Sequence, residues 1–132
     1  MLKNYVIELF STPPRSKIPN FDEQIMLDDF VRISRKSIKY IIDSRKEDDY
    51  SLEKILTMLE RAPQVIRNYQ MRIPNTNKSY PNSFISVRLY REEKSALMVI
   101  HQLNGEINDI YNSYYRKEKE FLNKYGVLIN EK

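Results

Sequence analysis

The chain of 132 residues contains no cysteine, two glycines and one histidine. Without cysteine it can form no disulfide and offers no thiolate to a metal ion. With only Gly105 and Gly126, it has no glycine-rich loop of the kind that cradles phosphates. The single histidine, His101, has no recognisable serine, cysteine or aspartate partner with which to build a nucleophilic site. The sequence therefore predicts a protein that is not an enzyme, with no catalytic residue, metal site or cofactor.

Long hydrophobic runs are absent as well. No stretch of roughly 18 apolar residues occurs, so no transmembrane helix and no membrane partner are predicted. The first residues lack the charged start, apolar stretch and cleavage site of a secretory leader. Apolar residues make up 41% and charged residues 30% of the chain, which is typical of a globular protein. One domain over 1–132 is expected, in the cytoplasm, or in the host-cell cytoplasm if the source is a virus.

The composition is skewed toward residues with AT-rich codons. The chain has 15 Ile, 12 Lys and 11 Asn, against 2 Ala and 2 Gly. This bias indicates a low-GC genome, such as that of a bacterium, a phage or another mobile element.

Acidic residues are missing from one long window, between Glu60 and Glu92. We call residues 61–91 the basic window. Residues 50–92 hold seven basic and three acidic residues, an excess of four that equals the net charge of the whole chain, +4. A positive surface with interleaved aromatic rings suits a phosphate backbone with stackable bases. An ordinary solvated basic face, with its aromatic residues in the core, is the alternative. The residues expected to bind nucleic acid are Arg61, Arg67, Arg72, Lys78, Tyr80, Arg88, Tyr90 and Arg91.

Apolar spacing predicts helices in the first half of the chain. A first helix, or a short strand, is expected within residues 2–10, followed by a proline-rich connector over 11–19. A helix over about 21–43 would begin after an N-cap at Asn20. Another would begin after an N-cap at Ser51, and Pro63 would end it, kink it or start a further short helix.

The second half is expected to end in one long helix. Residues 74–83 are predicted to form a loop because they are rich in Asn, Ser and Pro. Residues 84–92 fit either a helix or a strand, and the helix is preferred because a strong helical pattern follows. Apolar residues then repeat at alternating steps of three and four, a heptad-like spacing. The predicted fold class is all-α, a bundle of four to five helices with a long C-terminal helix at about 84–125.

Two functional hypotheses of different classes follow. The first is a small basic accessory protein that binds nucleic acid, DNA or RNA, within a larger assembly. The second is a helical protein–protein interaction module, such as an adaptor, an inhibitor or an assembly subunit. In that case the face of the predicted helix over 93–125 would contact a protein partner or a second copy of the chain.

Overall fold

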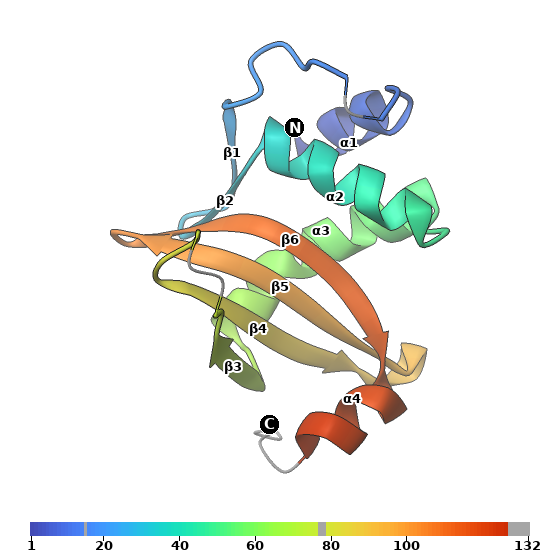
Figure 1. The fold of residues 1–132 in the computed structure, drawn as a ribbon, viewed down its shortest axis with the longest axis vertical. Coiled ribbons are helices and arrows are strands. Elements are labelled where there is room, and N and C mark those ends of the chain that lie inside the picture. The colour runs from blue at the N-terminus through green and yellow to red at the C-terminus, as the bar shows by residue number, and fades with distance from the viewer. Residues whose placement is uncertain (15, 77–78, 127–132) are drawn as a thin grey trace.

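The structure, a computed structural model, describes residues 1–14, 16–76 and 79–126. Within these residues the fold is mixed α/β, with six strands in one sheet and four α-helices (Figure 1), so the predicted all-α bundle is wrong. The elements in chain order are α1 (Leu2–Phe10), β1 (Gln24–Asp28), β2 (Val31–Ser34), α2 (Arg35–Glu47), α3 (Leu52–Arg67), β3 (Met71–Pro74), β4 (Ser83–Tyr90), the 3-10 helix η1 (Arg91–Glu93), β5 (Ser95–Asn104), β6 (Ile107–Lys117) and α4 (Glu118–Tyr125).

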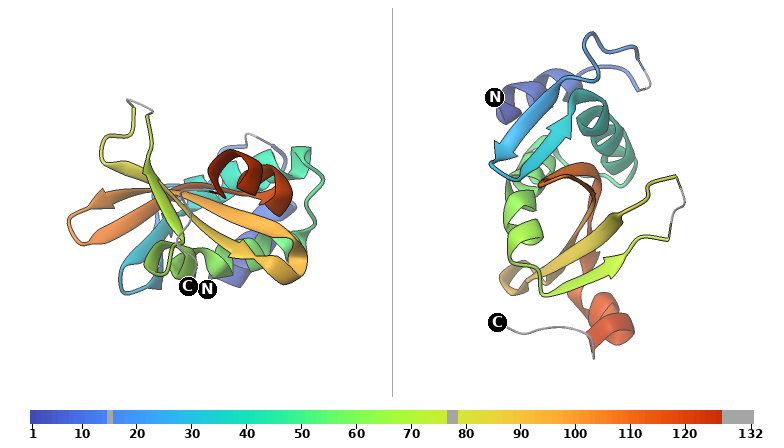
Figure 2. Two further views of the ribbon diagram at one scale, coloured as in Figure 1. Left: turned by 90° about the horizontal axis from the view of Figure 1, so that it is seen from below. Right: turned by 90° about the vertical axis from the view of Figure 1, so that its left-hand side faces the viewer.

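The strands lie in the order β1-β2-β6-β5-β4-β3 across the sheet. All neighbours are antiparallel except β2 and β6, which run parallel. This parallel pairing is short and extends from Val31 opposite Asn108 to Ile33 opposite Ile110. The β1–β2 hairpin therefore forms one edge of the sheet and β3 forms the other (Figure 2).

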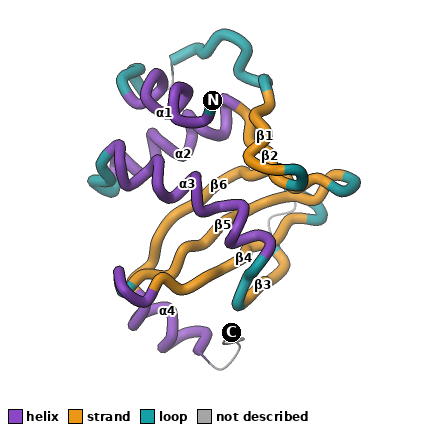
Figure 3. The backbone as a smooth tube through the Cα atoms, turned by 180° about the vertical axis from the view of Figure 1, so that it is seen from behind, coloured by secondary structure: helices purple, strands orange, loops and turns teal. Residues whose placement is uncertain are grey.

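A large apolar core lies behind the sheet, where α3 packs, and it extends to α1 and to α2 beside the β6 edge (Figure 1). α3 crosses the back of β4, β5 and β6 (Figure 3). Its Ile55 and Leu59 are fully buried in one cluster with Leu97 and Val99 of β5. Each such side chain contributes about 1.5–3 kcal/mol by leaving water, so this layer fixes the position of the sheet.

A second, smaller apolar cluster lies on the front face of the sheet. There Phe121 of α4 is buried among Val87, Ala96 and Met98. α4 lies at the end of the molecule opposite α1 and α2 (Figure 1), so it covers only that end of the front face. The part of the front face nearer α2 has no helix over it in the described residues.

α2 runs beside the second half of β6, where a neighbouring strand would otherwise lie (Figure 1). Side chains from this region bond to the exposed edge of β6. Nη1 of Arg45 donates to the carbonyl of Ser113 at 3.0 Å, and the Tyr50 hydroxyl accepts from the backbone N–H of Tyr115 at 2.9 Å. An open strand edge tends to pair with other chains. These bonds occupy the edge and fix α2 next to the sheet.

Residues 20–34 form the β1–β2 hairpin and the turn before it, in place of the predicted helix over 21–43. Asn20 has φ of 56°, in the left-handed region that Asn tolerates better than most residues, and it does not cap a helix. The helix begins later, where the hydroxyl of Ser34 accepts from the backbone N–H of Ser37 at 3.0 Å. The prediction failed here because strands as short as β1 and β2 do not distinguish the helical period of 3.6 residues from the strand period of two.

Two helices follow the sequence closely. The first helix is confirmed as α1, Leu2–Phe10. Ser51 is confirmed as the N-cap of α3, since its hydroxyl accepts from the backbone N–H of Lys54 at 3.1 Å. Pro63 lies inside this single helix and does not end it.

The predicted long helix over 84–125 is wrong, because these residues form β4, η1, β5, β6 and α4. There is consequently no helix face along 93–125 for a partner. Gly105, with φ of 64°, is the first residue of the two-residue turn between β5 and β6, a position that favours glycine. β5 is covered on both faces, so every residue of the run Ala96–Val99 is buried. The strand therefore lacks the alternation of apolar and polar residues by which a strand is usually recognised.

Candidate functional site

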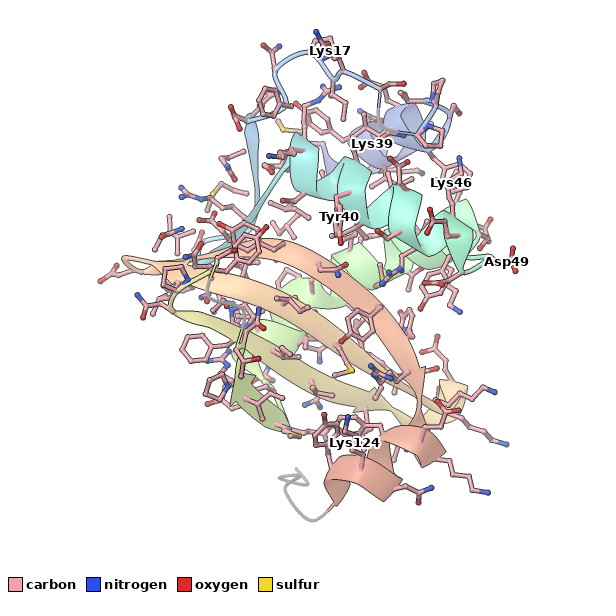
Figure 4. All side chains as sticks on the ribbon, in the orientation of Figure 1. Lys17, Lys39, Tyr40, Lys46, Asp49 and Lys124 are labelled. Carbon is pink, nitrogen blue, oxygen red and sulfur yellow. The ribbon has the colours of Figure 1, made fainter. Side chains whose placement is uncertain are left out.

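The front face of the sheet and α2 bound an open cleft of about 540 Å³. α2 forms one wall, β5 and β6 form the floor, and residues from the β3–β4 connection form the other wall. Tyr40, 56% exposed, projects from α2 on the side of β6, whereas its neighbour Lys39 lies on the side of α1 (Figure 4). The lining residues are Asp22, Gln24, Ser34, Lys36, Ser37, Tyr40, Asn75, Tyr80, Ile100, Tyr111 and Asn112.

A β-bulge in β6 turns two consecutive side chains into this cleft. Ile100 of β5 is opposite Asn112, whereas His101 is opposite Ile110, so Tyr111 is an extra residue in β6. Adjacent residues of a regular strand point to opposite faces. Here both Tyr111 and Asn112 line the cleft. Bulges re-aim side chains in this way and are over-represented beside functional sites.

Tyr80 and Tyr111 form an aromatic pair at one end of the cleft. Their ring centres lie 4.6 Å apart, with the ring planes tilted by 41°. The Tyr111 hydroxyl donates to Oε1 of Gln102 at 2.6 Å, and Nε2 of Gln102 donates to the carbonyl of Pro81, also at 2.6 Å. Burial raises the pKa of Tyr111, which keeps its hydroxyl protonated as a donor. The pair is thus held from both β5 and the β3–β4 connection.

Among the lining residues, Ser37, Asn112 and Lys36 each keep a hydrogen-bond donor for a ligand. The Ser34 hydroxyl accepts from the Ser37 backbone N–H at 3.0 Å and donates to Oγ of Ser37 at 3.1 Å, which leaves the Ser37 hydroxyl proton available. Oδ1 of Asn112 accepts from the Ser113 backbone N–H at 2.9 Å, which leaves the Asn112 amino group as a donor. Lys36 is exposed, and no carboxylate in the described residues forms an ion pair with it.

The backbone at the start of α2 contributes none of these donors. The N–H of Arg35 bonds to the carbonyl of Glu23 at 3.0 Å, and the N–H of Lys36 bonds to the carbonyl of Phe21 at 2.8 Å. The N–H of Ser37 bonds to the capping hydroxyl. An acceptor-rich ligand would therefore be held by side chains and not by the helix N-terminus.

A second hollow of about 430 Å³ lies further along β6, and Asn112 lines both this hollow and the cleft. The second hollow lies beneath the C-terminal half of α2 and is lined by Arg45, Tyr114 and Arg116, among others. The guanidinium groups of Arg45 and Arg116 each lie 5.5 Å from the centre of the Tyr114 ring. Arg45 is also ion-paired with Asp48, whereas Arg116 is exposed. We call the cleft and this hollow together the β6 groove.

Three arginines of the basic window form ion pairs within the molecule. The N···O distances are 2.6 Å for Arg61–Glu93, 2.6 Å for Arg67–Asp28 and 3.7 Å for Arg91–Glu118. The guanidinium of Arg61 also lies 4.1 Å from the ring centre of half-buried Tyr90. Of the other predicted residues, Tyr80 lies in the cleft, and Lys78 falls outside the described residues.

Arg72 and Arg88 bond to the end of α3. Nη2 of Arg72 donates to the carbonyl of Ile66 and its Nε donates to the Ser86 hydroxyl, at 2.6 and 2.7 Å. Nη1 of Arg88 donates to the carbonyl of Asn68 at 2.6 Å. Cations that bond to the last carbonyls of a helix stabilise it. The arginines on and around α3 therefore have structural partners, and they lie on the face of the sheet opposite the cleft.

The cleft residues of α2 and β6 were missed because the sequence placed both segments in long helices. One signal was available, Gly105 between two apolar runs, since glycine is favoured at the first position of a two-residue hairpin turn. It indicates the β5–β6 hairpin. It does not reveal the bulge at Tyr111, which decides what the hairpin presents to the cleft.

His101 does not take part in this cleft, because it is fully buried and faces the back of the sheet. Oδ1 of Asn108 can only accept, so Nδ1 of His101 carries the ring proton and donates it to Oδ1 at 2.8 Å. Nε2 of the neutral ring therefore accepts from the Ser86 hydroxyl at 2.7 Å, while Ser86 Oγ accepts from Nε of Arg72. Burial lowers the pKa of His101 to about 4. The imidazole is thus neutral near pH 7, and both of its nitrogens are already bonded.

In the described part of the chain, no three His, Asp or Glu side chains are grouped to hold a metal ion. No helix there is long and apolar enough to cross a bilayer. Comparisons of the chain with protein-family models, curated proteins and solved structures find no match. A functional proposal therefore depends on the geometry of the β6 groove.

Proposed function

We propose that this protein is a small, non-enzymatic nucleic-acid-binding protein and that the β6 groove is its interface. The observation that carries the proposal is the bulge at Tyr111, which turns Tyr111 and Asn112 into the cleft, where Tyr40, Tyr80 and the donors of α2 also lie. Phosphate oxygens are strong hydrogen-bond acceptors, and every base offers a face for stacking. The groove supplies a partner for both parts of a nucleotide chain.

The charge of the groove supports the same proposal. Lys36 lies at one end and Arg116 at the other, and the carboxylates among the lining residues are Asp22 and Asp48. Asp48 is paired with Arg45. The chain as a whole has a net charge of +4. Association with a polyanion would release counterions, so we expect affinity to fall steeply as salt is added.

A non-enzymatic role is supported by the state of His101. This residue would be the natural general base of a metal-free nuclease. Its burial and its bonds to Ser86 and Asn108 keep it from reaching a ligand in the groove.

The test is fluorescence anisotropy with labelled 20-nucleotide probes over a range of salt concentrations. Lys36→Gln should weaken binding and flatten the salt dependence. Lys124→Gln removes the same charge from α4, outside the groove, and should have a smaller effect (Figure 4). Tyr40→Ala should weaken binding by roughly tenfold, the loss of one stacked base. Tyr69→Ala, on the back next to Arg72, is the matched aromatic control.

Absence of binding at low salt would overturn the proposal. Equal losses in Lys36→Gln and Lys124→Gln, with no loss in Tyr40→Ala, would remove the groove as the interface. If a variant that combines Arg67→Gln and Arg88→Gln lost more affinity than Lys36→Gln, the interface would lie in the basic window and not in the β6 groove.

A further inference from the structure

The cleft end of the β6 groove has the dimensions and the chemistry of a seat for one nucleotide. Its volume of about 540 Å³ lies within the range of about 300–1,000 Å³ in which proteins bind small ligands. A base inside a duplex is stacked and paired, so only an unpaired base can enter such a cleft without first being extruded.

Aromatic surface for a base is present on two sides of the cleft. Tyr80 comes from the β3–β4 connection and Tyr40 from α2. Tyr80 packs on Tyr111, and the bonds from Gln102 to Tyr111 and Pro81 hold this pair in place. A ring that is fixed before binding loses little conformational entropy when a base stacks on it.

The donors are suited to a phosphate group. The Ser37 hydroxyl, the Asn112 amino group and the Lys36 ammonium line the same cleft. The Ser37 hydroxyl proton and the Asn112 amino group can donate to a phosphate oxygen, while the oxygen of each side chain already accepts one bond within the protein. Because two of these donors are uncharged and only Lys36 is a cation, we expect an isolated anion to bind here with modest affinity. A phosphate that is tethered to a stacked base should bind more tightly.

From these observations we infer that the cleft seats one unpaired nucleotide of a single strand, with its base against Tyr80 or Tyr40 and its phosphate on Lys36, Ser37 and Asn112. The neighbouring nucleotides then follow β6 past Tyr114 to Arg116. This inference rests on the proposed function and adds to it the substrate class, single-stranded nucleic acid.

Competition between strands tests the class of ligand. Unlabelled single-stranded DNA, single-stranded RNA and a duplex of the same sequence are titrated against a labelled single strand at low salt. Either single strand should compete at a concentration at least roughly tenfold lower than the duplex, and a strand with abasic sites should lose this advantage. A duplex that competes equally, or abasic strands that bind as well as intact ones, would overturn the inference. The proposed function would then still stand, whereas no binding by any probe would end both.

Asn112→Asp tests the phosphate seat. The aspartate can still accept from the Ser113 backbone N–H, but it presents an anionic oxygen where the amide presented a donor. We expect it to lower single-strand affinity by at least roughly tenfold, as loss of a charge-assisted bond does. Asn123→Asp, an exposed position on α4, makes the same change of charge and should lower affinity much less. Equal effects of the two variants would show that only net charge matters and would remove Asn112 from the seat.

Discussion

Nε2 of His101 lies 2.7 Å from the Ser86 hydroxyl, and both side chains are completely buried. Protonation of His101 would place a charge in this interior, next to the guanidinium of Arg72. The unfolded chain binds a proton near pH 6.5 and the folded chain only near pH 4. The unfolded state therefore holds more protons between these values, and stability should fall as pH falls through this window.

The expected size of this effect is about 3 kcal/mol below pH 4, since one pKa unit corresponds to about 1.4 kcal/mol. Urea denaturation between pH 7 and 4 measures it. His101→Gln removes the titrating group, so this variant should lose clearly less stability between pH 6.5 and 5. If the free energy of unfolding changed with pH in the same way in both proteins, His101 would not be the group responsible for the loss of stability.

Lys39 is buried and ties α2 to the end of α1. Its Nζ lies 2.8 Å from the carbonyl oxygen of Thr12 and 2.8 Å from Oδ1 of Asp43. Lys39→Met should lower the free energy of unfolding by about 2 kcal/mol, since charged hydrogen bonds are lost from a protected site. Lys36→Met, on the exposed side of the same helix, should change stability little. Equal urea midpoints for the two variants would show that the buried contacts do not stabilise the fold.

Leu97 and Leu103 belong to the same strand but differ in burial. Leu97 is fully buried, whereas Leu103 is 43% exposed near the β5–β6 turn. Leu97→Ala should cost about 2–5 kcal/mol, and Leu103→Ala should cost far less because water already reaches this side chain. Thermal unfolding followed by circular dichroism gives the comparison. A lower melting temperature for Leu103→Ala than for Leu97→Ala would support a helical spine over these residues and contradict the sheet.

Arg72 and Arg67 represent two kinds of arginine in the basic window, one that bonds within the fold and one that forms an ion pair at the surface. Arg72 is half-buried and bonds to Ile66 and Ser86, whereas Arg67 pairs with Asp28 at the surface. Arg72→Met should cost about 1.5–3 kcal/mol because it leaves the α3 carbonyl unpaired. Arg67→Met should cost less than about 1 kcal/mol, as is usual for exposed ion pairs. Chemical denaturation would contradict this ranking if Arg67→Met proved the more damaging change.

The parts of the fold that the sequence predicted depend on local hydrogen bonds and local spacing. The cap at Ser51 involves only its own helix, and the apolar face of Leu2–Phe10 is read directly from the residues. β5 could not be read in this way, because it is buried on both faces and its continuous apolar run also fits a helix. The glycine at 105 was the remaining clue to the hairpin.

The candidate site was hidden for a different reason. Counting charges along the chain cannot show which arginines have partners, since Arg67 pairs with an aspartate 39 residues away. The lining of the cleft comes from segments as distant as Asp22 and Asn112. Their meeting depends on a strand order and a bulge, and neither leaves a pattern in a single sequence.

The short parallel pairing between β2 and β6 also has a consequence for the order in which the molecule assembles. Arg32 and Asp109, which lie opposite one another across it, are 77 residues apart in the chain. The hairpins from β4 to β6 close over much shorter distances and can form earlier, because loop-closure entropy grows with length. The junction of β2 with β6 is therefore expected to form late in folding and to open early under stress. Since α2 follows directly from β2, the cleft takes its final shape only at this last step.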